Sequence, residues 1–531
     1  MNSDLLLRFE QLNQIGAALS NERNIDRLLE NILVAAKTIT HADGGTLYRM
    51  SDDGRRLHFA IVRSDSLNIA YGGATGSPLG EQFTDLALYR GDGEPNTSLV
   101  AAYSALHAET VNIADAYSEE GFDFSGTRKF DRVTGYRSQS FLTVPMKNHE
   151  NEVIGVLQLI NAIDRQSGAV RAFTDADRKL AESLASQAAV ALTNRLLVMQ
   201  LEELFEAFIH LINVAIDEKS PYTGGHCERV PPLTMMLAEA VNATTDGPLA
   251  SFAMDERDRY ELKIAGLLHD CGKVTTPVHV VDKATKLQTI FDRIGLIDTR
   301  FEVVRRAAEM AMWQAIAEGG ERAALEAEWQ SFNQALEADR AFLRQINVGS
   351  EAMSPDDQER VRRISRKYRW CNPLREMVDF LSDDEVENLT IRAGTLTNGE
   401  REIINHHIVA TIRMLESLPW PKHLQRVPEF AGGHHERVDG KGYPKGLRRD
   451  EMTVQARIMG IADIFEALTA RDRPYKPGMK LSQALSILGN FARNGHIDAD
   501  LFDVFIARKV YLDYARHYLD PAQIDVPLDG A

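Results

Sequence analysis

Apolar and polar residues follow two different periods along the first part of the chain. Apolar side chains recur at helical spacing over residues 5–19 and again over residues 21–40, where Asn24 precedes them and predicts a helix start. Strand-like runs then come in two pairs, "GGTLYRM" with "RLHFAIV" and "SFLTVPMK" with "EVIGVLQLIN", each pair separated by a short polar turn. This region is therefore predicted to be α+β, with an antiparallel sheet.

From residue 174 to 217 the pattern becomes that of one long helix. Ten positions in it alternate steps of four and three, as in a coiled coil. They are Leu180, Leu184, Gln187, Ala191, Asn194, Val198, Leu201, Phe205, Phe208 and Ile212. The pattern predicts the seam of a parallel dimer, with Gln187 and Asn194 setting its register. The alternative is a single helix packed on its own domain.

After residue 205 the chain has an almost wholly helical pattern. Residues 288–395 are long, charged and helical, and "RVRRISRKYRW", residues 360–370, is their most basic piece. We interpret this piece as a solvated helix face, with phosphate contact as the alternative.

Composition narrows the function classes. The chain has 531 residues, which predicts two or three domains, and a formal net charge of −17. That charge argues against binding a nucleic-acid polymer or a membrane surface, but not against one small anionic substrate. No apolar run is long enough to span a bilayer, and the first residues lack the basic region of a signal peptide, so we expect a cytoplasmic protein.

The three cysteines are too few and too dispersed for a disulfide framework. Cys227 and Cys271 stand next to histidines, and we interpret them as small buried residues rather than as ligands.

The stretch "AGGHHERVDGKGYPKGL", residues 431–447, places His434 and His435 side by side on a glycine-rich loop. Such a loop can aim neighbouring imidazoles at one ion, which a regular helix or strand would not readily do. Elsewhere, His269 and Asp270 end an apolar helical stretch in "GLLHDCGK", and His226 follows two glycines.

Two further candidates lie on predicted helices. A capping box formed by Thr397 and Glu400 predicts the start of the helix that carries His407. His407 lies on the apolar face of this helix and should be buried, whereas His406 lies off that face. Asp463 lies near an apolar helix face, where a carboxylate needs a partner or a metal. Five histidines and two aspartates are too many for one tetrahedral ion and suit two ions sharing a carboxylate. Two ions about 3.5–4 Å apart suit phosphodiester hydrolysis.

"HDCGK" followed by "HHERVDGKGYP" resembles the HD-GYP domain of the HD metallohydrolase superfamily. The resemblance implies an all-helical domain with iron or manganese that hydrolyses cyclic di-GMP to linear pGpG and often on to GMP. It implies seven metal ligands, which are His226, His269, Asp270, His407, His434, His435 and Asp463. In the motif itself Gly442, Tyr443 and Pro444 are the GYP.

The resemblance also implies roles for other residues. Lys273 matches a lysine that contacts the scissile phosphate, while Arg473 and Lys476 match basic phosphate-binding residues. Holding the loop in shape is the expected role of Arg437, Asp439 and Gly440, together with the GYP residues. Trinuclear members carry a glutamate where this chain has Tyr222, so we expect two divalent ions, Fe or Mn. His269 and His407 stand farther apart than in many members, which marks residues 288–395 as a helical insertion.

Residues 20–195 resemble a GAF domain. Asn161, Phe173 and Asp177 match a signature of cyclic-nucleotide-type members, but Ala162 and Arg178 replace its lysine and glutamate. We therefore expect that a Lys–Asp salt bridge is lost. The GAF domain either binds a small molecule or serves as a dimerisation module without a ligand. The expected order is an N-terminal helix (1–20), a GAF domain (21–195), a connecting coiled-coil-like helix (174–217) and an HD-GYP domain (205–525).

These expectations favour a homodimeric cyclic di-GMP phosphodiesterase with a binuclear site, regulated by its GAF domain. Asp270 and Lys273 carry the catalytic roles. Two alternatives remain open on the sequence. One is hydrolysis of another cyclic dinucleotide, cyclic GMP-AMP, and the other is a non-catalytic cyclic di-GMP receptor.

Overall fold

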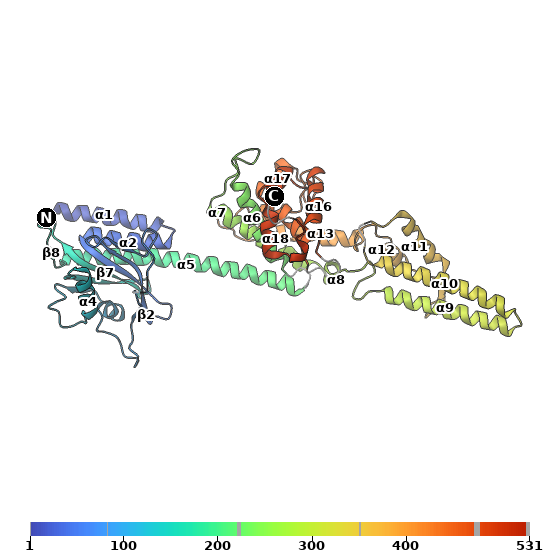
Figure 1. Ribbon diagram of the computed structural model, residues 1–531, viewed down its shortest axis with the longest axis horizontal. Helices are drawn as coiled ribbons and strands as arrows, with labels where there is room; N and C mark the ends of the chain where they lie inside the picture. Colours follow the sequence, from blue (N-terminus) through green and yellow to red (C-terminus); the bar gives the residue numbers. More distant parts are fainter. Residues whose placement is uncertain (1, 82, 220–224, 350–351, 472–477, 527–531) are drawn as a thin grey trace. The chain divides into compact units, whose positions relative to one another are not determined.

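The computed structural model describes residues 2–81, 83–219, 225–349, 352–471 and 478–526. It divides into two compact units, Met1–Leu204 and Phe205–Ala531 (Figure 1).

The first unit is built on one antiparallel sheet. Its strands are β1 (Ala42–Met50), β2 (Arg56–Ser64), β3 (Ile69–Tyr71), β4 (Leu86–Ala87), β5 (Val111–Ile113), β6 (Phe141–Lys147), β7 (Val153–Ile163) and β8 (Val170–Arg171). The order is β3-β2-β1-β7-β6-β5, with β4 on β2 and β8 on β7. The two hairpins predicted from the sequence are β1–β2 and β6–β7, and both are confirmed.

Helices cover both faces of this sheet, because successive strand residues point to opposite sides. On β1, Leu47 packs in a core with α1 (Asn2–Asn21), α2 (Ile25–Thr40) and the first part of α5 (Asp175–Lys219). Its neighbour Tyr48 packs on the other side with α3 (Val100–His107). The first unit also contains α4 (Ser125–Thr134). The predicted cap is confirmed, since the Asn24 side chain accepts a hydrogen bond from the backbone N–H of Arg27.

The signature Lys–Asp salt bridge is absent, as expected from Ala162, but Asp177 still pairs with a cation. Arg171 on β8 donates from Nη1 to Oδ2 of Asp177 at 2.7 Å, and Asp177 is fully buried. An arginine on a neighbouring strand therefore supplies the cation that Ala162 cannot. Asn161 is also used, since its amide bonds the backbone of Gln139 and Arg137.

The long helix α5 is confirmed, but the predicted seam is wrong in part. Leu180 and Leu184 are buried in the core of the first unit, and Phe205 packs against the core of the second. Leu201 and Phe208 are 65% and 56% exposed. The first apolar residues of the predicted seam therefore pack in the core of the first unit rather than against a second copy of the helix.

The second unit is a helical bundle that carries a long insertion. The bundle contains α6 (His226–Asn242), α7 (Glu256–Leu268), α8 (Val278–Val281), α13 (Asn398–Glu416), α14 (Val427–Gly432), α15 (Val454–Thr469), α16 (Leu481–Arg493), α17 (Ala499–Ala507) and α18 (Val510–Tyr518). Their apolar faces share one core, which includes Leu262, Phe430, Phe465 and Phe505. Three 3₁₀ turns, Cys271–Thr275, Arg449–Glu451 and Pro521–Gln523, complete it.

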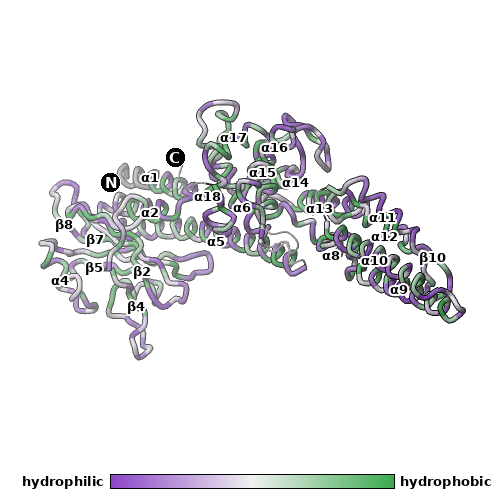
Figure 2. Tube along the Cα trace, turned by 45° about the vertical axis from the view of Figure 1, so that its right-hand side comes forward, coloured by the Kyte–Doolittle hydropathy of each residue, from purple (hydrophilic) through white to green (hydrophobic). Residues whose placement is uncertain are grey.

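The insertion has a core of its own. Its helices are α9 (Ile294–Ala317), α10 (Arg322–Asn347), α11 (Pro355–Lys367) and α12 (Asp383–Leu389). The first two pack side by side, with hydrophobic and hydrophilic residues interspersed along both (Figure 2). Phe301, Leu343 and Phe380 lie in the insertion core. The all-helical prediction misses one feature, a two-stranded antiparallel hairpin of β9 (Arg369–Cys371) and β10 (Met377–Asp379).

None of the helices in the described part of the chain combines the length and apolar character that crossing a bilayer requires.

Candidate metal centre

His269 and Asp270 lie at the C-terminal end of α7, both almost fully buried. The Nδ1 atom of His269 lies 2.7 Å from the carbonyl oxygen of Gly266, three residues earlier. A carbonyl only accepts hydrogen bonds, so Nδ1 carries the proton and Nε2 keeps its lone pair. The end of α7 therefore presents one unprotonated imidazole nitrogen beside a carboxylate.

The same local arrangement recurs at two other histidines. On α13 the Nδ1 atom of His407 donates to the carbonyl of Ile404, and that of His434 donates to the carbonyl of Ala431 at 2.6 Å. Within the described part of the chain Nε2 of His434 is buried and has no hydrogen-bond partner. A buried nitrogen lone pair without a donor is a costly arrangement that a metal ion would relieve.

The donor atoms form two groups that share Asp270. His226, His269 and Asp270 make one group, and Asp270, His407, His434 and His435 make the other, with the donor atoms of each group within 4.8 Å of one another. Oδ2 of Asp270 lies 3.2 Å from Nε2 of both His226 and His269. Oδ1 lies 3.2 Å from Nε2 of His407. One carboxylate thus turns an oxygen toward each group, as a bridging ligand does.

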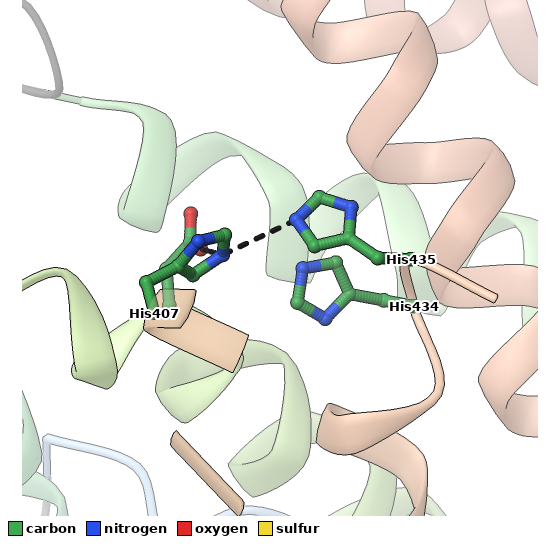
Figure 3. Close-up of side chains that lie close together, drawn as sticks. His407, His434 and His435 are labelled. Carbon is green, nitrogen blue, oxygen red and sulfur yellow. Dashed lines mark hydrogen bonds and ion pairs between the residues drawn. The ribbon is translucent and has the colours of Figure 1, made fainter. Parts of the chain in front are cut away.

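The glycine-rich loop brings the adjacent imidazoles toward α13 (Figure 3). Nε2 of His435 lies 3.2 Å from Nε2 of His407. The ring of His435 stacks on that of Tyr443, with centroids 4.9 Å apart. Since Nε2 of His407 bears a lone pair, this short separation suits two ligands of one cation.

Asp463 on α15 lies between the two groups. Its Oδ1 is 3.1 Å from Nε2 of His226, and its Oδ2 is 3.9 Å from Nδ1 of His435. The structure therefore brings together all seven residues expected as ligands, from four helices and one loop. As expected, His407 is buried while His406 is exposed.

Electrostatic interactions in the centre favour the neutral form of His434 and His435 and the ionised form of the aspartates. Burial and the neighbouring ring of His435 lower the pKa of His434 well below its usual value, and burial lowers the pKa of His435 to about 4. Burial opposes ionisation of Asp270, but Lys273 and His269 hold its pKa well below the usual range. Neutral histidines and ionised aspartates are the forms that bind divalent metals.

His226 lies in the most negative part of the centre. Burial opposes a charge on its ring, yet Asp270, Asp463 and Glu466 together raise its pKa well above the usual value. A divalent cation at this position would neutralise the same carboxylates.

Contacts within the loop account for its shape. Arg437 makes a bidentate ion pair with Asp439, at 3.1 and 2.8 Å, and Asp439 also accepts from the backbone of Lys441. Gly440 has a φ of 80°, a conformation that favours glycine. A Cβ on Gly442 would lie 2.3 Å from the backbone nitrogen of Arg437, so the loop crosses itself closely there. The peptide bond between Tyr443 and Pro444 is cis.

The other residues with predicted roles are the basic residues expected to contact phosphate, Tyr222 and two cysteines. Nζ of Lys273 lies 2.5 Å from Oδ2 of Asp270. Arg473, Lys476 and Tyr222 lie outside the described residues. Cys227 and Cys271 are buried beside the centre and belong to neither donor group.

Sequence reasoning missed two buried residues, Glu466 and Glu436, and one partly buried residue, Arg229, next to the candidate ligands. The carboxylate of Glu466 contacts both His226 and Arg229. Glu436 accepts from the backbone of Lys445 and Leu447 and so holds the loop. Helical spacing could have found two of them, since Glu466 follows Asp463 by three residues and Arg229 follows His226 by three.

Models of known families match both units. Residues 24–192 match a GAF domain model, and residues 223–341 and 383–501 match two models that are each described as an HD domain. An HD domain implies divalent metal binding, and the two donor groups supply the side chains for it.

Similar proteins occur in Vibrio cholerae serotype O1. The chain is 44% identical over 80 residues to 3'3'-cGAMP-specific phosphodiesterase 1, covering 15% of this chain and 18% of that protein. It is 32% identical over 148 residues to a probable cyclic di-GMP phosphodiesterase, covering 27% and 33%. It is 25% identical over 283 residues to 3'3'-cGAMP-specific phosphodiesterase 3, covering 53% and 35%. The matches thus span about a third or less of each relative's length.

Proposed function

We propose that this chain, which joins a GAF domain to an HD domain of the HD-GYP type, is a metal-dependent phosphodiesterase. Its substrate is cyclic di-GMP, which it hydrolyses to pGpG or on to GMP, under control of the GAF domain. The observation that carries the proposal is the division of donors into two groups around the two oxygens of Asp270.

The residues present fit two divalent ions. His226, His269 and Asp463 would hold one, and His407, His434 and His435 the other, with Asp270 between them. We propose iron or manganese, because histidine and carboxylate ligands suit both. When bound, such a pair supplies Lewis-acid activation of water and of the phosphoryl oxygens.

The chain's own residues bind and orient the phosphodiester. Lys273 points its ammonium group at the shared carboxylate, where it is placed to stabilise negative charge on the phosphoryl oxygens. Asp270 and His269 are almost fully buried, so little water reaches their side chains. In this proposal Arg473 and Lys476 add positive charge for the phosphates.

Cyclic GMP-AMP is the second candidate substrate. Two of the relatives described above are named for that dinucleotide, and one is named for cyclic di-GMP. The same ligands would serve both reactions, because the two substrates differ only in one base.

We further propose that the chain works as a homodimer through the GAF domain and α5, with a small molecule bound to the GAF domain as its signal. Support comes from the large apolar residues that α5 leaves exposed, including Leu197, Leu201, Leu204 and Phe208.

The test is a turnover comparison with anaerobically purified protein loaded with Mn(II) or Fe(II). Chromatography follows cyclic di-GMP and cyclic GMP-AMP in parallel, with His434→Ala as the inactive variant. Formation of pGpG or GMP, absent in His434→Ala, supports the proposal. Faster turnover of cyclic GMP-AMP favours the second candidate, and tight binding of cyclic di-GMP without turnover indicates a receptor.

A further inference from the structure

Glu466 is a buried carboxylate that contacts a candidate ligand without being one of the donors. It lies on α15, one turn after Asp463, and is only 1% exposed. Its Oε2 accepts a hydrogen bond from Nδ1 of His226, and its Oε1 lies 2.7 Å from Nε of Arg229. Both oxygens are therefore engaged, one by the imidazole and one by a guanidinium that fixes the carboxylate.

His226 needs this partner because of its position in the fold. The Nδ1 atoms of His269, His407 and His434 each bond the carbonyl three residues earlier. His226 is instead the first residue of α6, so no preceding turn of its own helix offers a carbonyl. The carboxylate of Glu466, on another helix, takes the place of that carbonyl.

We propose that Glu466, held by Arg229, is a positioning residue that fixes the tautomer and ring orientation of His226 toward a metal ion. When the Nδ1–H group of His226 donates its hydrogen bond to Glu466, Nε2 keeps its lone pair. Nε2 then faces Oδ2 of Asp270 and Oδ1 of Asp463, 3.2 and 3.1 Å away. Carboxylates behind a ligating imidazole orient the ring and raise its basicity. The inference rests on the proposed metal function.

Glu466 should influence only one of the two donor groups. His226 belongs to the group with His269 and Asp270, and among the described residues Glu466 makes no hydrogen bond or ion pair with His407, His434 or His435. Loss of Glu466 should therefore weaken one of two bound ions and spare the other.

The experiment measures Mn(II) binding by the full chain, by equilibrium dialysis at graded free Mn(II) with ion counting. Glu466→Leu removes the acceptor, and Glu466→Gln keeps an oxygen that can accept from Nδ1. Glu385→Gln is the matched control, since Glu385 is an equally buried carboxylate paired with Arg300 and touches no histidine among the described residues.

In Glu466→Leu we expect one ion to bind about 10- to 100-fold more weakly and the other to bind as in the wild type. Glu466→Gln should show a smaller loss at the same ion, and Glu385→Gln none. Excess Mn(II) should restore turnover in Glu466→Leu, which a folding defect would not allow. If Glu466→Leu does not fold, Glu466→Gln and Arg229→Gln decide the question.

Native affinity for both ions in the Glu466 variants, or equal weakening of both ions, overturns the inference. The binding readout separates this inference from the proposed function. A wild type that binds two ions but turns over neither dinucleotide contradicts the function alone, while uniform binding in Glu466→Leu contradicts the inference alone.

Discussion

At the scale of single residues, the position of one proton decides what each imidazole can do. Backbone carbonyls hold the Nδ1 proton of His269, His407 and His434, so their Nε2 atoms converge as lone pairs. Buried nitrogen lone pairs that face one another make no hydrogen bond with each other. A divalent cation between them would stabilise the arrangement.

Lys273 should matter for turnover rather than for metal binding. Its ammonium group contacts Asp270 and would stabilise charge that develops on the phosphate. We expect Lys273→Met to lower kcat by about 10²- to 10³-fold, with the bound metal content unchanged. Steady-state kinetics beside ion counting measures both quantities. Lys422→Met, at an exposed position, is the control, and native kcat in Lys273→Met would contradict the assignment.

Lys286 makes the insertion's stability depend on pH. It is only 1% exposed and donates to the carbonyls of Leu389 and Ile391. Burial lowers its pKa to about 8, although Asp357 opposes the shift. The unfolded chain therefore binds more protons than the folded one between about pH 8 and the ordinary lysine pKa near 10.4, so this contribution to stability rises with pH.

We expect the free energy of unfolding of the wild type, minus that of Lys286→Met, to rise by on the order of 1–3 kcal/mol from pH 8 to pH 10. Urea unfolding at several pH values measures it. A difference that stays constant or falls over this range would show that Lys286 is charged in the folded protein.

The sequence indicates the candidate ligands but not the residues behind them. His434 and His435 belong to a long motif, and histidine and aspartate are residue types that bind metals. Glu466 and Arg229 look like any charged pair on two helices until folding brings them within 2.7 Å. Their role arises because α6 begins at His226 and offers its Nδ1 atom no carbonyl of a preceding turn. That Glu466 lies close enough to replace this carbonyl depends on how α6 and α15 pack.

At the scale of elements, the glycine-rich loop holds its shape by close backbone approach. A Cβ on Gly442 would meet the backbone of Glu436 and Arg437 at 2.3–2.6 Å. Backbone atoms cannot move aside as a flexible side chain can.

We expect Gly442→Ala to destabilise the protein by about 1–3 kcal/mol and to abolish most turnover, because the loop carries His434 and His435. Gly399→Ala is the matched control, since a Cβ there meets nothing within 4 Å and the position is in the first turn of α13. Thermal unfolding and turnover would be measured for both. Equal behaviour of the two variants would refute the steric account.

The helix α5 shows why periodicity alone could not identify a dimer seam. A pattern of steps of four and three marks an apolar face, but not which partner covers it. Leu180 and Leu184 are covered by their own sheet and helices, whereas Leu201 and Phe208 are not. The hairpins and the caps could be predicted because neighbours in sequence decide them.

Dimerisation can be tested on the exposed part of α5. We expect Leu201→Glu combined with Phe208→Glu to shift the molar mass toward the monomer, because four like charges would meet in the seam. Light scattering after size-exclusion chromatography measures it, with Glu203→Gln as the control at another exposed position. A wild type that is already monomeric would contradict the proposed dimer.

At the scale of the molecule, one centre is assembled from residues spread between His226 and Asp463. The insertion lies between Asp270 and His407, and its connection to α13 is secured by Lys283, which pairs with Glu400 and also bonds Asn388. The same Glu400 closes the capping box with Thr397. The sequence predicted that the insertion is helical, but its separate core and small hairpin depend on contacts too distant in sequence to read.

In the proposed binuclear centre, the two oxygens of Asp270 face the two donor groups. The most direct test counts the ions bound to Asp270→Ala and measures its turnover of cyclic di-GMP on the same preparation. We expect two ions and turnover in the wild type, and loss of both ions together with turnover in Asp270→Ala. Retention of two ions and full activity in the variant would contradict it.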